Sequence, residues 1–202
     1  MPTTFSFLRL RIPEPLPSAT YDAADQQISF GGQTLTYDLN GNLTSDGVNT
    51  YTWNARNQLV AINGASVTAS FSYDALGRRQ SKFVNGTSTQ FLYDGITPVQ
   101  EIGAAATAHL LTGLGIDEYF ARSDVAGRRT LLTDALGSTV VLADDAGALQ
   151  TQYAYEPFGA TTASGAADAN VFQYTGREND GTGLYYYRAR YYSSVFARFI
   201  SS

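Results

Sequence analysis

A short turn motif recurs at least seven times in this chain, and it constrains the fold more than any other feature. Each copy has Asp, Asn or Glu followed three residues later by Gly or Asn. An Asx side chain at the first position accepts a hydrogen bond from the backbone two residues on, and the fourth residue supplies the positive φ that reverses the chain. We therefore expect seven tight turns. The copies begin at Asp38, Asn54, Asp74, Asp124, Asp134, Asp144 and Glu156.

The spacing of these turns predicts short strands between them. Neighbouring copies lie 16 and 20 residues apart in the first half of the chain, and 10, 10 and 12 apart in the second. Regular turn signals of this kind are typical of antiparallel β arrays. The sequence predicts an all-β fold, a repetitive antiparallel β-hairpin array. Further hairpin signals are the six Asx–Gly pairs that begin at Asn40, Asp46, Asn63, Asn85, Asp94 and Asp180.

Alternating polarity supports this prediction in two segments, residues 66–73 and 148–155. Such strands have one buried face and one wet face. Residues 160–170 read as a loop of small residues, and no segment predicts a helix. The inward-facing side chains predicted on the two strands are Val67, Ala69, Phe71, Tyr73, Leu149, Tyr153 and Tyr155.

The overall composition restricts the partners and the organisation of the chain. Internal repetition over 202 residues favours one elongated array over two separate cores. A formal net charge of -5 argues against nucleic acid as a partner, because phosphate binding needs clustered Lys and Arg. The chain has no cysteine, so it has no disulfide and no thiolate metal site. No apolar run approaches the roughly 18 residues of a membrane helix.

The first residues differ from the repeats. We expect residues 1–20 to form an extended N-terminal arm and residues 21–202 to form the β array, because three prolines in residues 13–17 favour an extended conformation. The start reads poorly as a signal peptide, since it lacks an unbroken apolar segment. The arm could add a strand to a neighbouring subunit. Its candidate assembly residues are Phe5, Phe7, Leu8 and Leu10.

Residues 184–192 hold five of the 14 tyrosines, together with two arginines. On one continuous strand, Arg188 and Arg190 would share a face with Tyr186 and Tyr192, which gives a ladder suited to cation–π contacts. One interpretation is structural packing. The other is an aromatic and basic platform that binds a glycan or a protein partner, with these four residues as the candidate binding or stacking residues.

We expect no enzymatic activity and no cofactor. The only histidine, His109, has no second His or Cys with which to bind a metal, and reads as a surface residue. Asp144 and Asp145 are adjacent, so on a strand they would face opposite ways and could not share a proton; they fit a turn. The segment Gly113-Leu114-Gly115 lacks the third glycine of a nucleotide-binding loop. No catalytic, metal-binding or cofactor-binding residue is predicted.

The C-terminal third resembles the core of YD-repeat (Rhs) proteins, with the signature at residues 172–201. The resemblance extends over roughly residues 30–201. Members of this family include the encapsulating component of insecticidal Tc toxins, bacterial polymorphic toxins and the teneurins; their repeats wind into a β-sheet shell that often holds a toxic C-terminal domain. The segments that carry the resemblance are Tyr174-Thr175-Gly176-Arg177-Glu178, Thr182-Gly183-Leu184-Tyr185-Tyr186-Tyr187-Arg188-Ala189-Arg190-Tyr191-Tyr192 and Arg198-Phe199-Ile200-Ser201.

The resemblance implies an open fragment of an Rhs-type shell, extracellular or at the cell surface. Two departures bear on its function. Residues 193–197 lack the family's usual Pro and Gly, and the Asp-Pro motif at which an aspartyl autoprotease releases the toxin does not occur before Ser202. The resemblance therefore implies a shell fragment without the releasing chemistry.

Three functions remain open. The first is a non-enzymatic structural protein that forms a wall or assembles with copies of itself, including into filaments, because an array with a single lysine, Lys82, has few charges to guard its edges. The second is a cell-surface binding module for a glycan or a protein. The third is the truncated encapsulating end of an Rhs toxin.

Overall fold

The computed structural model describes residues 17–201, in which most of the regular structure is β-strand. One antiparallel sheet runs from β4 to β17, and each strand in it pairs with its neighbours in sequence. This meander confirms the predicted all-β hairpin array. Its strands are β4 (Thr36–Tyr37), β5 (Leu43–Ser45), β6 (Asn49–Trp53), β7 (Leu59–Gly64), β8 (Thr68–Tyr73), β9 (Arg79–Val84), β10 (Thr87–Asp94), β11 (Thr97–Gly103), β12 (Thr107–Thr112), β13 (Tyr119–Asp124), β14 (Gly127–Thr133), β15 (Thr139–Ala143), β16 (Leu149–Tyr155) and β17 (Thr161–Gly165).

Two smaller sheets flank this meander in the sequence. The first contains β1 (Ala19–Tyr21), β2 (Gln27–Phe30) and β3 (Gln33–Thr34), and only Leu35 separates β3 from β4. The second contains β18 (Glu178–Asn179), β19 (Leu184–Tyr187), β20 (Arg190–Ser193) and β21 (Arg198–Phe199). A short 3-10 turn, η1 (Tyr174–Gly176), precedes it. The predicted assembly residues Phe5, Phe7, Leu8 and Leu10 lie outside the described residues.

The turn motifs form as the sequence predicts. In six of the seven copies, the first side chain accepts a hydrogen bond of 2.8–3.0 Å from the backbone N–H two residues on. Asn57 replaces glycine in the second copy and adopts a φ of 57°. The exception is Glu156, which makes the backbone bonds with Gly159 and Ala160 but no such side-chain bond. The sequence motif misses a similar turn at Asp22, because Asp25 rather than Gly or Asn takes the positive φ there.

The pattern of buried side chains follows the predicted alternation in residues 66–73, and follows it only in part in residues 148–155. In β8, Ala69 and Phe71 are buried and the polar residues on either side of each are exposed, as predicted. In β16, Tyr153 is buried, but Leu149 is exposed because it lies at the strand's beginning beside the Asp144 turn. Residues 160–170 are not all loop, since β17 forms there and pairs with β16 along its whole length.

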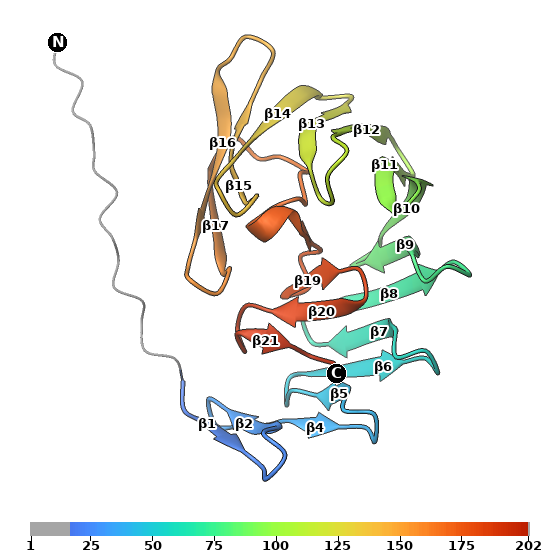
Figure 1. Ribbon diagram of the computed structural model, residues 1–202, viewed down its shortest axis with the longest axis vertical. Coiled ribbons are helices and arrows are strands. Elements are labelled where there is room, and N and C mark those ends of the chain that lie inside the picture. The colour runs from blue at the N-terminus through green and yellow to red at the C-terminus, as the bar shows by residue number, and fades with distance from the viewer. Residues whose placement is uncertain (1–16, 202) are drawn as a thin grey trace, which may run out of the picture.

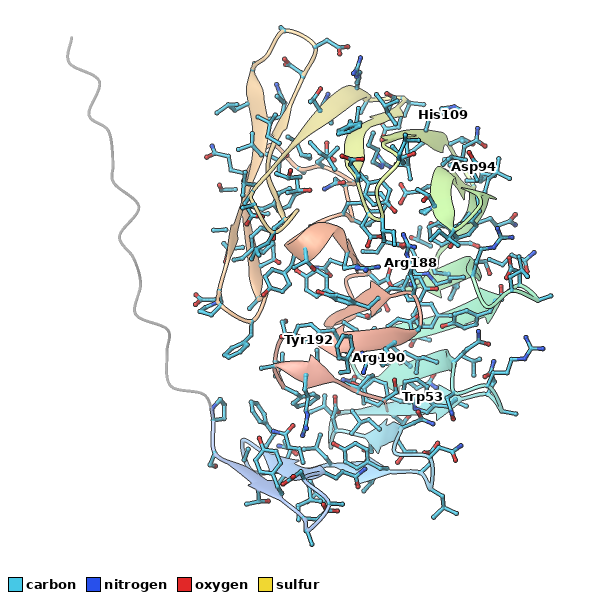
Figure 2. The ribbon with its side chains drawn as sticks, viewed as in Figure 1. Trp53, Asp94, His109, Arg188, Arg190 and Tyr192 are labelled. Atoms are coloured by element: carbon cyan, nitrogen blue, oxygen red, sulfur yellow. The ribbon has the colours of Figure 1, made fainter. Side chains whose placement is uncertain are left out.

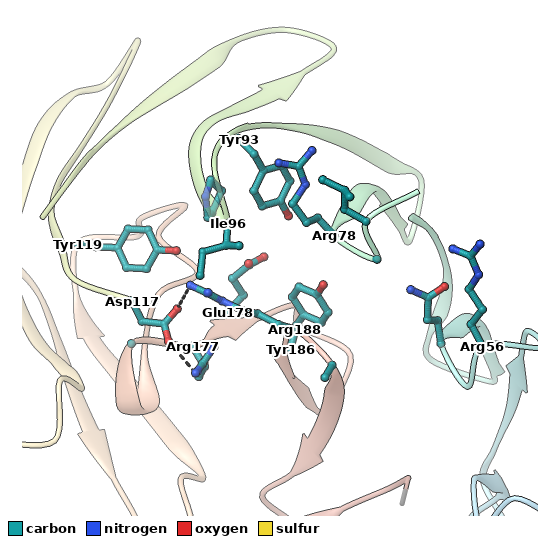
Figure 3. Close-up of a pocket in the computed structure, with 16 residues that line it drawn as sticks. Arg56, Arg78, Tyr93, Ile96, Asp117, Tyr119, Arg177, Glu178, Tyr186 and Arg188 are labelled. Atoms are coloured by element: carbon teal, nitrogen blue, oxygen red, sulfur yellow. Dashed lines mark hydrogen bonds and ion pairs between the residues drawn. The ribbon is translucent and has the colours of Figure 1, made fainter. Parts of the chain in front are cut away.

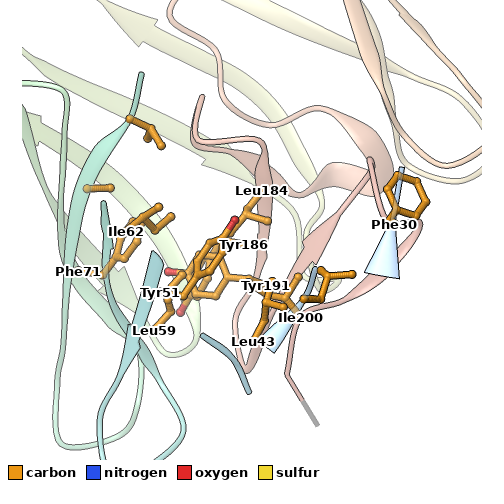
Figure 4. Close-up of a cluster of buried hydrophobic side chains, with 13 residues drawn as sticks. Phe30, Leu43, Tyr51, Leu59, Ile62, Phe71, Leu184, Tyr186, Tyr191 and Ile200 are labelled. Atoms are coloured by element: carbon orange, nitrogen blue, oxygen red, sulfur yellow. The ribbon is translucent and has the colours of Figure 1, made fainter. Parts of the chain in front are cut away.

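The meander curls, and the C-terminal segment lies inside its curve (Figure 1). One hydrophobic cluster joins residues of β5–β8 to β19, β20 and Ile200 (Figure 4). A second cluster places Phe172, just before η1, against β12–β16, where its ring stacks on Tyr119 with centroids 3.8 Å apart. The C-terminal segment therefore fills the concave side of the sheet. None of the residues from 17 to 201 forms a helix long and apolar enough to cross a membrane.

Candidate functional site

The tyrosine-rich segment is a hairpin and not the single strand that the sequence predicts. Its two strands, β19 and β20, pair antiparallel, with Tyr186 opposite Tyr191 and Tyr187 opposite Arg190. Arg188 takes a left-handed φ of 61° and, with Ala189, turns the chain. The prediction that Arg188 and Arg190 share one strand face with Tyr186 and Tyr192 is therefore wrong, because the turn lies in the middle of the segment.

Of the candidate binding residues, Arg188 consequently lies apart from Arg190 and Tyr192 (Figure 2). Tyr186 points into the core, whereas Arg188 extends from the turn. Arg190 stacks over Phe199, 3.9 Å from its ring centroid, and Tyr192 packs on the same ring with centroids 5.5 Å apart. Their role in binding stays a prediction.

A buried cluster of charges joins the hairpin region to the meander. Arg79 of β9 is fully buried and forms ion pairs with Glu178 and Asp180. Lys82 lies 2.9 Å from the second of these carboxylates. The Arg79 guanidinium also lies over the rings of Tyr186, Phe91 and Phe71. This cluster is the main polar contact between the concave face and the segment that fills it.

Burial and charge act in opposite directions on these groups. Burial alone raises the pKa of Asp180, but Arg79 and Lys82 outweigh it and hold that pKa below its ordinary value. Burial raises the pKa of Glu178, which Arg79 offsets only in part. Burial also lowers the pKa of Arg79, and the two carboxylates more than reverse this effect. The guanidinium therefore stays charged in the interior.

A pocket of about 440 Å³ opens between the β19–β20 hairpin and the row of turns that connects strands of the meander, and we call it the rim pocket (Figure 3). Turns of the meander and the β19–β20 turn meet there. It combines basic, aromatic and apolar side chains. The residues that line it are Arg56, Gln58, Leu76, Gly77, Arg78, Tyr93, Ile96, Pro98, Asp117, Tyr119, Gly176, Arg177, Glu178, Tyr186, Arg188 and Ala189.

Positive charge exceeds negative charge in the rim pocket. Arg177 and Arg188 both pair with Asp117, at 2.7 and 2.6 Å. Arg78 pairs with Asp74, at 2.7 Å, and lies over the ring of Tyr93. Arg56 is exposed and forms no ion pair with any residue in the described range 17–201.

Two tyrosine hydroxyls in this pocket make no hydrogen bond with the described part of the chain. They belong to Tyr119 and Tyr186, whose rings are more than nine-tenths buried. The hydroxyl of Tyr93, in contrast, donates to the Arg79 carbonyl over 2.9 Å. The pocket therefore offers two phenol donors in addition to its guanidinium groups.

A second pocket of about 510 Å³ lies beside the other end of the hairpin. Arg190 and Tyr192 line it together with Arg198 and Asp25. Two of the four predicted residues thus line one pocket and two line the other, so they do not form the single platform that the sequence predicted.

The residues considered for catalysis occupy ordinary positions. His109 is exposed on β12, and Gln100 lies within hydrogen-bond distance of its Nδ1 (3.1 Å). Asp144 begins a turn, as expected, and accepts hydrogen bonds from Ala146 and Ala148. Within residues 17–201, no three His, Cys, Asp or Glu side chains gather as a metal site would require.

Sequence reasoning missed the residues that organise the rim. The sequence assigned no role to Arg79, Glu178, Asp180 or Asp117. Arg79 pairs with the first two carboxylates across 99 and 101 positions, and Asp117 pairs with Arg188 across 71. No local pattern marks Arg79 and Lys82, which stand three positions apart in β9 and are both buried.

The comparisons with known proteins agree with this architecture. The family model described as Teneurin YD-shell matches residues 14–202. The tRNA nuclease WapA of Bacillus subtilis (strain 168) is 31% identical over 194 residues, which cover 91% of this chain and 8% of that protein. The toxin subunit YenC1 of Yersinia entomophaga is 27% identical over 220 residues, which cover 91% of this chain and 21% of that protein.

Solved structures show the same fold. The Tc holotoxin pore of Photorhabdus luminescens superposes with a TM-score of 0.65 at 16% identity, over 92% of this chain and 12% of that chain. A complex described as TcdB2-TccC3-Cdc42 gives 0.61 at 18% identity, over 93% and 14% of the two chains. The chain thus spans a small part of the proteins that it matches.

Proposed function

This chain belongs to the teneurin YD-shell family, and from its architecture we propose that it serves as a non-enzymatic wall segment of a shell. The observation that carries this proposal is the contact between a continuous one-layer sheet and the segment that fills its concave side. In this role the chain forms part of the wall that closes the shell, and it catalyses no reaction. We further propose that the wall encloses toxin-related cargo outside the cell. Two similar proteins support the link to toxins, since one is named a tRNA nuclease and the other a toxin subunit.

The edges of the sheet support assembly as part of this function. Among the described residues, no strand pairs with the outer side of β17, and β17 contains no charged residue and no proline. Charges and prolines are the usual guards against strand addition. We propose that this edge pairs with a strand from the same shell or from a second copy of the chain, giving a dimer or a filament.

The experiment compares assembly in the full chain with that of two edge variants. Sedimentation velocity at micromolar concentration should show assemblies for the wild type. Thr162→Lys and Ser164→Lys place charge on β17 and should shift the chain to monomer. Gln90→Lys is the matched control, because Gln90 is equally exposed but lies on the interior strand β10.

A second arm of the experiment tests the N-terminal residues. Deletion of residues 1–12 removes Phe5, Phe7, Leu8 and Leu10 and should weaken assembly if the arm connects subunits. A wild-type chain that sediments as a sharp monomer at all concentrations contradicts self-assembly. Assemblies that persist in the β17 variants would place the contact elsewhere.

A further inference from the structure

We propose that the rim pocket binds an acidic sugar, a pyranose that carries one carboxylate group. This inference is independent of the wall function, because it concerns a small ligand at a site that closure does not require. It rests on the charges, the free hydroxyl groups and the size of the pocket.

The excess of positive charge favours a small anion. Arg177 and Arg188 share a single carboxylate, that of Asp117, so one guanidinium charge has no counter-charge. Arg56 adds a second, because it makes no ion pair within residues 17–201. A guanidinium group presents parallel N–H donors that match a carboxylate in two-point contact. The ligand's carboxylate would bind beside Arg188, whereas Arg56 lies at the other end of the pocket (Figure 3).

The remaining groups suit a ring that carries several hydroxyls. The free hydroxyls of Tyr119 and Tyr186 can donate to sugar oxygens, and Asp117 can accept from a sugar hydroxyl. Ile96 and Pro98 supply apolar surface for the C–H face of the ring. The volume of about 440 Å³ lies within the range of small-molecule sites.

The acidic groups in the lining argue against a ligand with more charge. Asp117 and Glu178 face the same space, and a phosphate with two negative charges would lie close to both. A monoanion with neutral hydroxyls fits the mixture of donors and acceptors better than inorganic phosphate or a polyacidic peptide.

The test is a titration of the full chain with glucuronate, followed by ¹H–¹⁵N NMR. We expect saturable shifts at rim-pocket residues, with an affinity at least about tenfold higher than for glucose, acetate, inorganic phosphate or tri-glutamate, since the proposal needs carboxylate and ring together. Equal or tighter binding of any one of these four probes overturns the proposal. So does the absence of saturable binding of glucuronate.

Two variants locate the site without disturbing the core. Arg188→Gln removes a guanidinium that extends from the β19–β20 turn, and Tyr119→Phe removes only a hydroxyl while its ring can still stack on Phe172. Each should weaken glucuronate binding by about tenfold. Arg128→Gln is the control, since Arg128 is half exposed and lies outside the pocket. If the control lowers the affinity as much as the two variants, binding is non-specific and the proposal fails.

Discussion

The guanidinium carbon of Arg79 in β9 lies 4.0 Å from the ring centroid of Tyr186 in β19. This contact brings a strand of the meander and a strand of the C-terminal hairpin together around one buried charge. Arg79 is completely inaccessible to solvent, and Glu178 and Asp180 neutralise it. The attachment of the C-terminal segment to the concave face therefore depends on a charged cluster as well as on apolar packing.

Replacing Arg79 with leucine should lower the free energy of unfolding by about 3–5 kcal/mol, because it leaves the buried Glu178 carboxylate without a counter-charge and Asp180 with Lys82 alone. Urea unfolding followed by tyrosine fluorescence measures the loss. Arg128→Leu is the control and should change stability by less than about 0.5 kcal/mol. A loss at Arg79 no greater than at Arg128 would show that the cluster does not hold the segment.

Tyr191→Ala should cost about 3–5 kcal/mol, because the ring is almost fully buried and packs on Phe71 and Tyr186. Tyr187→Ala should cost less, about 1–3 kcal/mol, because Tyr187 is only half-buried. Its hydroxyl shares a 2.6 Å hydrogen bond with Thr175. Thermal and urea unfolding of both variants give the comparison, and a larger loss for Tyr187 would contradict the order of burial.

The Glu156 turn can be improved. Its backbone bonds match those of the Asp38 turn, but its longer side chain does not accept the bond from the residue two positions on. Glu156→Asp should therefore add a hydrogen bond from Phe158 and stabilise the chain by about 0.5–1.5 kcal/mol. Glu156→Ala, which cannot make this bond, is the control. Equal unfolding midpoints for the Asp and Ala variants would reject the explanation.

Acid should weaken the chain through Asp46. Burial raises the pKa of this carboxyl, but hydrogen bonds from the Tyr51 hydroxyl (2.6 Å) and from Asn49 and Val48 hold it below the ordinary value. A lowered pKa in the folded state contributes stability above the unfolded-state pKa of about 3.9 and loses it as pH falls through the folded-state pKa. This contribution is therefore complete at pH 7 and declines below about pH 4.

Urea midpoints at pH 7, 5 and 3 test this dependence. The difference in urea midpoint between the wild type and Asp46→Asn should be the same at pH 7 and pH 5, and smaller at pH 3. Asp145→Asn is the control, because Asp145 is exposed and its closest cation, Arg128, lies 4.0 Å away. A gap that stays constant down to pH 3 would mean that Asp46 titrates normally in the folded chain.

Local chemistry explains what the sequence could predict. Asp38, Asp74 and Asp134 make their turns through bonds to residues two and four positions ahead, so five adjacent residues contain the information. The Arg188 turn has no such signal, because arginine rarely adopts a positive φ and neither Gly nor Asn stands beside it. Contacts between Arg79 and Asp180 span 101 positions, and no local pattern specifies them. The rim pocket depends on those distant contacts and could not be foreseen.

The position of the C-terminal segment also sets the order in which the chain can mature. Each strand of the meander finds its partner soon after synthesis, because its neighbours are adjacent in sequence. The residues that cover the concave side are made after the strands that they cover, and Tyr191 meets Tyr73 across 118 positions. Until residues 172–201 have left the ribosome, Leu59, Ile62 and Phe71 face water. Nascent chains should therefore recruit chaperones until that segment emerges.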